Sequence, residues 1–352
     1  MMSEGNTIRL PGLIDVHVHL RDPGQTHKED FTTGTQAALA GGFTTIVDMP
    51  NNAEPITTIE RLKQKIAIAQ SKTVADIGFH YGTMGDNLES FEEAAGLAIG
   101  LKLYLNKTTG GYLLDAKHLQ KIYSAWPEAK PVLLHAEEDV IDIAIESMKD
   151  LKRPIHVCHM PSKEILQKII AAKKDGLPVT CGVCPHHLFL TKADESRLGV
   201  YGKMLPSLKS QEDQDFLWKN LDYIDIFESD HAPHTHEEKA EGAFGVPGLE
   251  TTLPLLLTAY KQGRISLEQI IEKCHTNPAR IFNLPVDEGT YLEIDMTEYE
   301  INNESLYTKC GWSPFAGRKV YGKVKKVVIR DRTVVTDGTV VAVPGSGKVM
   351  GG

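Results

Sequence analysis

Leu13-Ile14-Asp15-Val16-His17-Val18-His19-Leu20 is an aliphatic run near the start of the chain that carries two histidines. Turn-forming residues flank this short apolar run, a pattern that predicts a β-strand. Residues two apart on a strand point to the same face, so the Cβ atoms of His17 and His19 would lie roughly 7 Å apart on one side. Two imidazoles in this arrangement can bind one metal ion. A pair of hydrogen-bonded histidines at a strand end is the alternative that the motif alone leaves open.

Further residues of the types that bind metal ions follow the ends of later apolar runs. His135 directly follows the run 131–134, and His159 follows the run 154–158. Asp230 comes shortly after the run 224–228. Polar ligands gathered where buried strands pass into loops are the expected layout of an active site at one end of a barrel.

Eight apolar runs alternate with helical patterns along the first 290 residues, which predicts an α/β fold, a TIM (β/α)8 barrel. An open doubly wound sheet would need a glycine-rich phosphate loop after the first strand, and the sequence has none there. The predicted strands are 14–19, 44–49, 76–81, 100–105, 132–135, 155–159, 179–183 and 224–228.

Residues 291–352 show a different pattern, and we expect them to form a small C-terminal β appendage that ends in a flexible, glycine-rich tail. The chain begins almost at the first barrel strand. We therefore expect the appendage to consist of C-terminal strands alone, with an exposed edge that a partner could cover.

Composition narrows the class of protein. The chain has 352 residues and a net charge of −9, which argues against nucleic acid and anionic membrane surfaces as partners. No apolar run approaches the roughly 20 residues of a membrane span, and the first residues do not resemble a signal peptide. Five cysteines in a chain of this length do not suggest a disulfide framework, so we expect a cytoplasmic protein.

Lys102 stands alone among apolar residues in the fourth predicted strand, Gly100-Leu101-Lys102-Leu103-Tyr104-Leu105. A buried ammonium is costly unless it is paired, and such lysines tend to lose their charge. One interpretation is an ion pair, and another is a side chain that reaches out to the barrel mouth. A third is chemical, because a neutral lysine amine can add CO₂ to become a carbamate that bridges two metal ions.

Several motifs together resemble the dihydroorotase family, in the binuclear zinc branch of the amidohydrolase superfamily. The likeness runs from about Leu10 to Gly322. It is strongest to the long form of these enzymes, including the version found as a domain of multifunctional pyrimidine-synthesis polypeptides. The motifs are Pro11-Gly12-Leu13-Ile14-Asp15-Val16-His17-Val18-His19-Leu20-Arg21-Asp22-Pro23-Gly24, Met49-Pro50-Asn51, Gly100-Leu101-Lys102, Cys184-Pro185-His186-His187-Leu188, Ser229-Asp230-His231-Ala232-Pro233-His234 and Pro247-Gly248-Leu249-Glu250-Thr251.

The resemblance implies a zinc-dependent enzyme that cyclises N-carbamoyl-L-aspartate to L-dihydroorotate reversibly. A hydroxide bridging the two zinc ions would attack the ring amide carbonyl, and Asp230 would serve as general base and acid. The implied ligands are His17, His19 and Asp230 for the first zinc, His135 and His159 for the second, and a carboxylated Lys102 that bridges the two.

The substrate carboxylate calls for a cation, and Arg21 directly follows the strand that carries the two histidines. A surface salt bridge with Asp22 or Asp15 is the alternative for Arg21. The resemblance also implies substrate binding by Asn51 and His234 and by backbone groups of Pro247 and Gly248.

Two positions depart from the family pattern. Leu205 stands where a polar residue usually touches the substrate, and Gly182 replaces a common acidic residue. We expect both changes to remove polar groups from the barrel mouth. Two other functions stay open: a different cyclic-amide hydrolase, such as an allantoinase or hydantoinase, and a non-catalytic scaffold for aspartate transcarbamoylase. Aspartate transcarbamoylase or a second copy of the chain is the expected partner.

Overall fold

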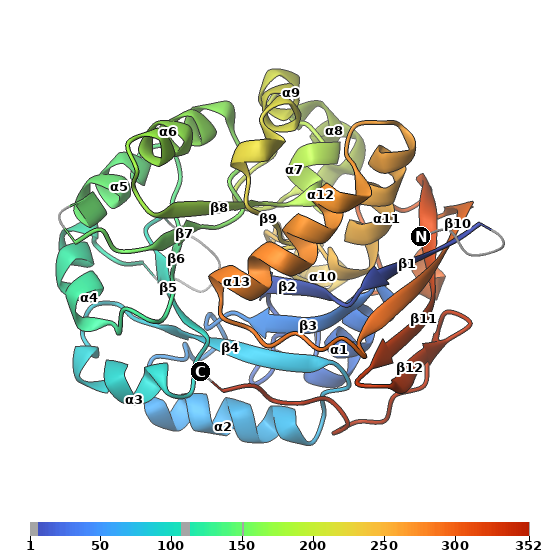
Figure 1. Cartoon of the computed structure of the whole chain (residues 1–352), viewed down its shortest axis with the longest axis horizontal. Helices are drawn as coiled ribbons and strands as arrows, with labels where there is room; N and C mark the ends of the chain where they lie inside the picture. Colours follow the sequence, from blue (N-terminus) through green and yellow to red (C-terminus); the bar gives the residue numbers. More distant parts are fainter. Residues whose placement is uncertain (1–5, 107–112, 150, 352) are drawn as a thin grey trace.

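A computed structural model describes residues 6–106, 113–149 and 151–351. Its eight-stranded parallel sheet runs in chain order from β2 to β9, with helices outside it (Figure 1). An isolated parallel bridge between Val18 and His231 joins the first strand to the segment after the last. The predicted TIM barrel is therefore confirmed. Its strands are β2 (Leu13–Val18), β3 (Phe43–Asp48), β4 (Asp76–Gly82), β5 (Gly100–Tyr104), β6 (Val132–His135), β7 (Ile155–Val157), β8 (Val179–Val183) and β9 (Ile226–Phe227).

The helices begin where the sequence offers good N-caps. Asp30, Thr58 and Ser162 precede three of them, and each side chain accepts a hydrogen bond from a backbone N–H in the first turn. None of the described helices is long and apolar enough to cross a membrane. The α-helices are α1 (Phe31–Ala40), α2 (Ile59–Gln70), α3 (Phe91–Ala95), α4 (Leu119–Ala125), α5 (Ile141–Lys149), α6 (Lys163–Lys174), α7 (Pro185–Phe189), α8 (Lys192–Leu198), α9 (Gln211–Lys219), α10 (His236–Ala240), α11 (Leu249–Lys261), α12 (Leu267–Ile271) and α13 (Asn277–Ile281).

A second, antiparallel sheet of five strands lies beside α11 at one flank of the barrel (Figure 1). Its order is β1 (Thr7–Pro11), β10 (Tyr291–Glu300), β11 (Lys319–Ile329), β12 (Arg332–Thr336) and β13 (Thr339–Val340). The expectation that only C-terminal strands build this sheet was wrong, because β1 precedes the barrel and pairs with β10.

The sheet packs closely on α11. Gly322 of β11 has a positive φ of 95°, and a Cβ there would overlap the side chain of Leu257. Only glycine therefore fits this close approach.

The C-terminal segment is held against the barrel, which contradicts the flexible tail that its glycines suggest. The amide of Ile77 on β4 donates to the carbonyl of Lys348, and the amide of Met350 donates back to the Ile77 carbonyl. The Met350 side chain is buried with Phe282 and Leu284 in an apolar cluster. Burial of this methionine helps to hold the C-terminal segment on the barrel, which the sequence pattern did not indicate.

A buried ion pair ties α2 to the barrel rim that carries the first histidines. The Nζ of Lys65 lies 2.7 Å from Asp48 Oδ2 and donates to the carbonyl of Met49 and to Asn52 Oδ1, both at 2.8 Å. The other oxygen of Asp48 accepts from the amide of Leu20 at 2.7 Å. Lys65 and Asp48 are almost fully buried.

Lys65→Met should lower the free energy of unfolding by about 3–5 kcal/mol, because it leaves the Asp48 carboxylate buried without its partner. Lys63→Met on the same helix is the control, since Lys63 and Glu93 pair on the surface with 58% of each side chain exposed. That variant should lose less than about 1 kcal/mol. Urea denaturation measures both, and equal losses would contradict the structural role of Lys65.

Candidate metal centre and substrate pocket

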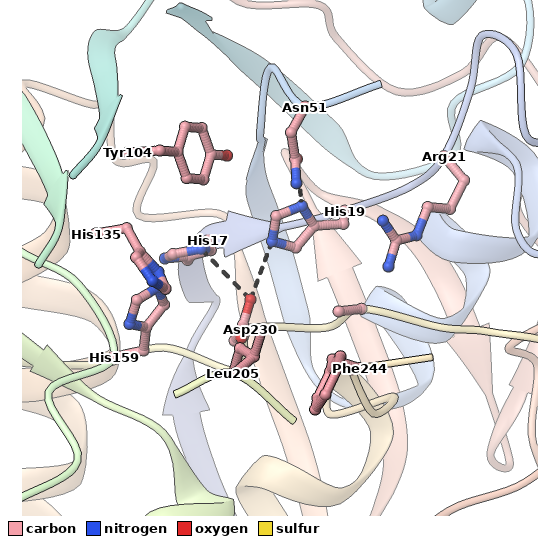
Figure 2. Close-up of a pocket in the computed structure, with 12 residues that line it drawn as sticks. His17, His19, Arg21, Asn51, Tyr104, His135, His159, Leu205, Asp230 and Phe244 are labelled. Atoms are coloured by element: carbon pink, nitrogen blue, oxygen red, sulfur yellow. Dashed lines mark hydrogen bonds and ion pairs between the residues drawn. The ribbon is translucent and has the colours of Figure 1, made fainter. Parts of the chain in front are cut away.

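A pocket lies at the carboxyl ends of the barrel strands (Figure 2). Its walls come from the ends of β2, β3, β5, β6 and β7 and from the segments after β8 and β9. The lining residues are His17, His19, Arg21, Asn51, Tyr104, His135, His159, Leu205, Asp230, Ala232, Phe244 and Gly245.

Five of the six predicted metal ligands converge in this pocket. Asp230 Oδ1 lies 3.0 Å from His19 Nε2 and 3.4 Å from His17 Nε2. One ligand atom from each of these three side chains lies within 4.8 Å of the others. His135 Nδ1 lies 3.0 Å from His159 Nε2, and the rings of His159 and His17 are 4.9 Å apart (Figure 2). The histidines from β2, β6 and β7 therefore share one site.

The sixth predicted ligand, Lys102, lies on β5 with no exposed surface. Its Nζ has no hydrogen-bond partner among the residues that the structure describes, and it lies 5.1 Å from the ring centre of Tyr104. No carboxylate in the described ranges pairs with it, so neither the ion pair nor the solvent-reaching side chain is observed. Burial is the main cause that lowers the pKa values of His17, His135 and His159, and the charge of Lys102 contributes to each.

The protonation of the site suits metal binding. Burial lowers the pKa values of His17, His19 and His159 well below the usual 6.5, and that of His135 also falls. These imidazoles are therefore neutral at pH 7 and keep a lone pair for a metal. Burial raises the pKa of Asp230 to about 7, and the nearby Lys102 ammonium opposes that rise.

Two further observations indicate that the side chains of this pocket are suited to bind a metal ion. His19 Nδ1 lies 2.7 Å from Asn51 Oδ1, an arrangement that leaves Nε2 to face Asp230 and a metal. His159 Nδ1, like Lys102 Nζ, is a buried polar atom without a hydrogen-bond partner among the described residues. Buried orphan atoms are costly, and a bound cation would give the His159 nitrogen a partner, whereas the Lys102 ammonium would need an anion.

The backbone around the site is strained. Arg21, His159 and Asp230 have φ values of 64°, 36° and 45°, in the left-handed region that side chains other than glycine rarely adopt. Such strain costs of order 1–3 kcal/mol per residue and persists where surrounding structure holds it, commonly at functional sites. It turns these three side chains into the pocket as their strands end.

Glu228 is a site residue that the sequence argument missed. Its Oε2 lies 3.2 Å from His17 Nδ1, and its Oε1 accepts from the amide of His159. Neighbouring histidines keep the pKa of this buried carboxyl low despite the opposing effect of burial. Glu228 lies two residues before Asp230, the same spacing as His17 and His19, and that spacing was the available signal.

We expected Gly182, which replaces a common acidic residue, to remove a polar group from the barrel mouth. That expectation is corrected, because another acidic side chain occupies the space beside Gly182. A Cβ at position 182 would overlap the carboxylate of Glu228. An acidic group therefore does occupy this space, but it comes from the residue that directly follows β9 and not from β8. Leu205, by contrast, does line the pocket as an apolar residue.

Arg21 is buried, with 4% of its surface exposed, and lines the pocket. Its Nε donates to the carbonyl of Pro233 at 3.2 Å, and its Nη2 lies 3.2 Å from His234 Nε2. Asp22 pairs with Lys72 instead, and Asp15 accepts from backbone amides. The surface salt bridge considered for Arg21 is therefore not formed.

The remaining predicted substrate residues differ in position. Asn51 lines the pocket, whereas His234, Pro247 and Gly248 are not among the described residues that line it. His234 lies next to the pocket, because it contacts Arg21, which lines it. The amide of Gly248 donates to His231 Nδ1 at 3.2 Å.

Comparison with known sequences identifies relatives along nearly the whole chain. A model of the amidohydrolase family matches residues 8–348. The multifunctional protein CAD of Squalus acanthias is 45% identical over 354 residues, which cover 99% of this chain and 16% of that protein. A dihydroorotase of Pyrococcus abyssi is 36% identical over 372 residues, which cover 99% of this chain and 88% of that enzyme. The chain thus spans only a small part of the first relative but most of the second.

Solved structures agree with the fold. An L-hydantoinase (dihydropyrimidinase) from Arthrobacter aurescens has a TM-score of 0.93 and 25% identity, covering 98% of this chain and 89% of that one. The inactive dihydroorotase-like domain of a CAD-like multifunctional protein from Chaetomium thermophilum has a TM-score of 0.84 and 29% identity, covering 98% and 99%. Because the family model spans nearly the whole chain and the sequence relatives agree with it, this protein belongs to the amidohydrolase family, as a homologue of its dihydroorotases.

Proposed function

We propose that the protein is a dihydroorotase of pyrimidine biosynthesis, which interconverts N-carbamoyl-L-aspartate and L-dihydroorotate. The observation that carries this proposal is Arg21, a buried guanidinium in the pocket with no ion-pair partner among the described residues. A desolvated cation without an anion is costly, and a substrate carboxylate would supply the missing charge through two parallel hydrogen bonds. The matching dihydroorotases support the same activity.

The cofactor we propose is a pair of zinc ions, with His17, His19 and Asp230 holding one and His135 and His159 the other. Lys102, carboxylated on Nζ, would bridge them. Its burial without a hydrogen bond favours this modification, because a carbamate bound to two cations removes the cost of an unpaired ammonium. When bound, zinc would polarise the amide carbonyl and lower the pKa of water toward 7.

The residues of the chain would divide the remaining work. Asp230 would be ionised beside the cations, since positive charge lowers the pKa of a carboxyl group, and would accept a proton as general base. It would return that proton to the ring nitrogen as the amide opens. Arg21 and Asn51, with His234, would hold the substrate carboxylate and set which carbonyl faces the metal pair. We assign Pro247 and Gly248 to the same side of the ring through their backbone groups.

The same site bears on the two alternative functions, a hydantoinase-like enzyme and a non-catalytic scaffold. A hydantoinase-like enzyme fits the barrel, but its cyclic amides carry no ring carboxylate for Arg21. A scaffold without catalysis would not need the ligands, and His17, His19 and Asp230 converge here. By analogy with the CAD relatives we propose aspartate transcarbamoylase, or a second copy of the chain, as the partner, and the cytoplasm as the compartment.

Arg21→Met should lower kcat/KM for dihydroorotate by about 100-fold or more, because two charge-assisted hydrogen bonds to the carboxylate are lost. Activity on an uncharged hydantoin should change little. Arg197→Met is the control, since Arg197 pairs with Asp194 on the surface. Initial rates on both substrates measure the effect, and a near-normal KM for dihydroorotate would contradict the assignment of Arg21.

Removal of metal should abolish activity, and added zinc should restore it to a protein that holds about two ions per chain. Lys102→Met should bind less zinc and lose activity, while Lys117→Met, an exposed control, should keep both. Elemental analysis measures the metal. A carbamate carbon signal after incubation with ¹³C-bicarbonate should appear in the wild type and be absent in Lys102→Met. Two zinc ions without that signal would contradict the carboxylation alone.

A further inference from the structure

Lys239 is a buried lysine outside the metal centre that makes an unusual set of contacts. It lies on α10 with no exposed surface. Its Nζ donates to three backbone carbonyls, those of Lys203 at 2.8 Å, Ala243 at 2.7 Å and Gly245 at 3.0 Å. No carboxylate of the described chain pairs with it. An ammonium has three N–H donors, so these three carbonyls satisfy it completely.

The three carbonyls belong to two segments that both reach the pocket. Lys203 lies two residues before Leu205, and Ala243 and Gly245 flank Phe244. Leu205, Phe244 and Gly245 line the pocket, where Leu205 and Phe244 lie on the same side as Asp230 (Figure 2). The amide of Gly245 also donates to the Lys203 carbonyl at 3.1 Å. Lys239 thus joins the two segments that carry the apolar wall formed by Leu205 and Phe244.

The other side of Lys239 connects to the substrate side of the pocket. Its Nζ lies 5.5 Å from the ring centre of Trp312, a buried residue before β11. Trp312 Nε1 donates to the carbonyl of His234 at 2.8 Å, and His234 lies beside Arg21. One ammonium therefore lies between the apolar wall and the residues that support the guanidinium.

Direct participation in binding does not explain Lys239. It is not among the lining residues, and each of its donors already has an acceptor. Burial lowers its pKa to about 8, so at neutral pH most of the population is still the ammonium that these carbonyls require. Packing of the Phe244 side chain contributes little to its position, because 42% of that residue is exposed.

We propose that Lys239 is a positioning residue that holds Leu205 and Phe244 as an apolar wall against the ring of a cyclic-amide substrate. This inference rests on the proposed function for the identity of the ring. The wall would exclude water from the part of the ring that it contacts. Because it contacts the ring before and during the reaction alike, its loss acts mainly on KM.

The test compares Lys239→Met with Lys273→Met. Lys273 is also buried and donates to a backbone carbonyl, that of Ile224 at 2.6 Å, just before β9 begins and so at the end of the barrel away from the pocket. Both variants lose one buried lysine, and both should unfold more easily. Only Lys239→Met should raise KM, by about tenfold, with kcat within about threefold and zinc content unchanged. Lys239→Arg keeps the charge and N–H donors and should recover part of the loss.

Hydrogen exchange provides a readout that does not need activity. Amides of residues 203–206 and 243–246 should exchange faster in Lys239→Met and at the wild-type rate in Lys273→Met. An unchanged KM and unchanged exchange in Lys239→Met, or the same KM rise in Lys273→Met, would overturn the proposal. A wild type inactive on dihydroorotate would overturn the proposed function instead, and the exchange rates would still decide whether Lys239 holds the wall.

Discussion

The amide of His19 donates to the carbonyl of His231 at 2.8 Å, and this bond joins the two ends of the parallel sheet. Residues more than 200 positions apart meet there, so that His19 and Asp230 lie 3.0 Å from each other. In an open sheet these strands would be opposite edges. Closure is therefore the constraint on which the site depends, because it brings the carboxyl ends of all eight strands around one opening.

Closure also concentrates polar groups in a dry space, and the structure satisfies most of them in a specific way. Asp15 accepts from the amides of His17 and Ser229, Glu228 contacts His17 and the amide of His159, and Asp48 pairs with Lys65. Among the described residues, the atoms left without a hydrogen-bond partner include His159 Nδ1, whose side chain lines the pocket, and Lys102 Nζ. A buried polar atom without a partner calls for an explanation, and a bound group at this site would supply one.

Support for the pocket also comes from outside the barrel. Glu29, two residues before α1, has its Oε2 3.3 Å from His231 Nε2 and accepts from the amide of Lys309 at 3.2 Å. Trp312, from the same segment before β11, donates to the carbonyl of His234. The chain between β10 and β11 therefore braces the residues that follow the last barrel strand, although it lies far from them in the sequence.

The sequence by itself determined the barrel and the ligand types, because strand periodicity and the spacing of His17 and His19 are local properties that survive without tertiary contacts. It also placed Arg21 beside these histidines. Only the tertiary structure decided that Glu228, directly after β9, fills the space beside Gly182, that β1 pairs with β10 and that Met350 is buried. It also decided that Lys239 joins two distant segments. The physical reason is that these outcomes depend on which volumes and carbonyls meet across long separations in the chain, and no local pattern records such encounters.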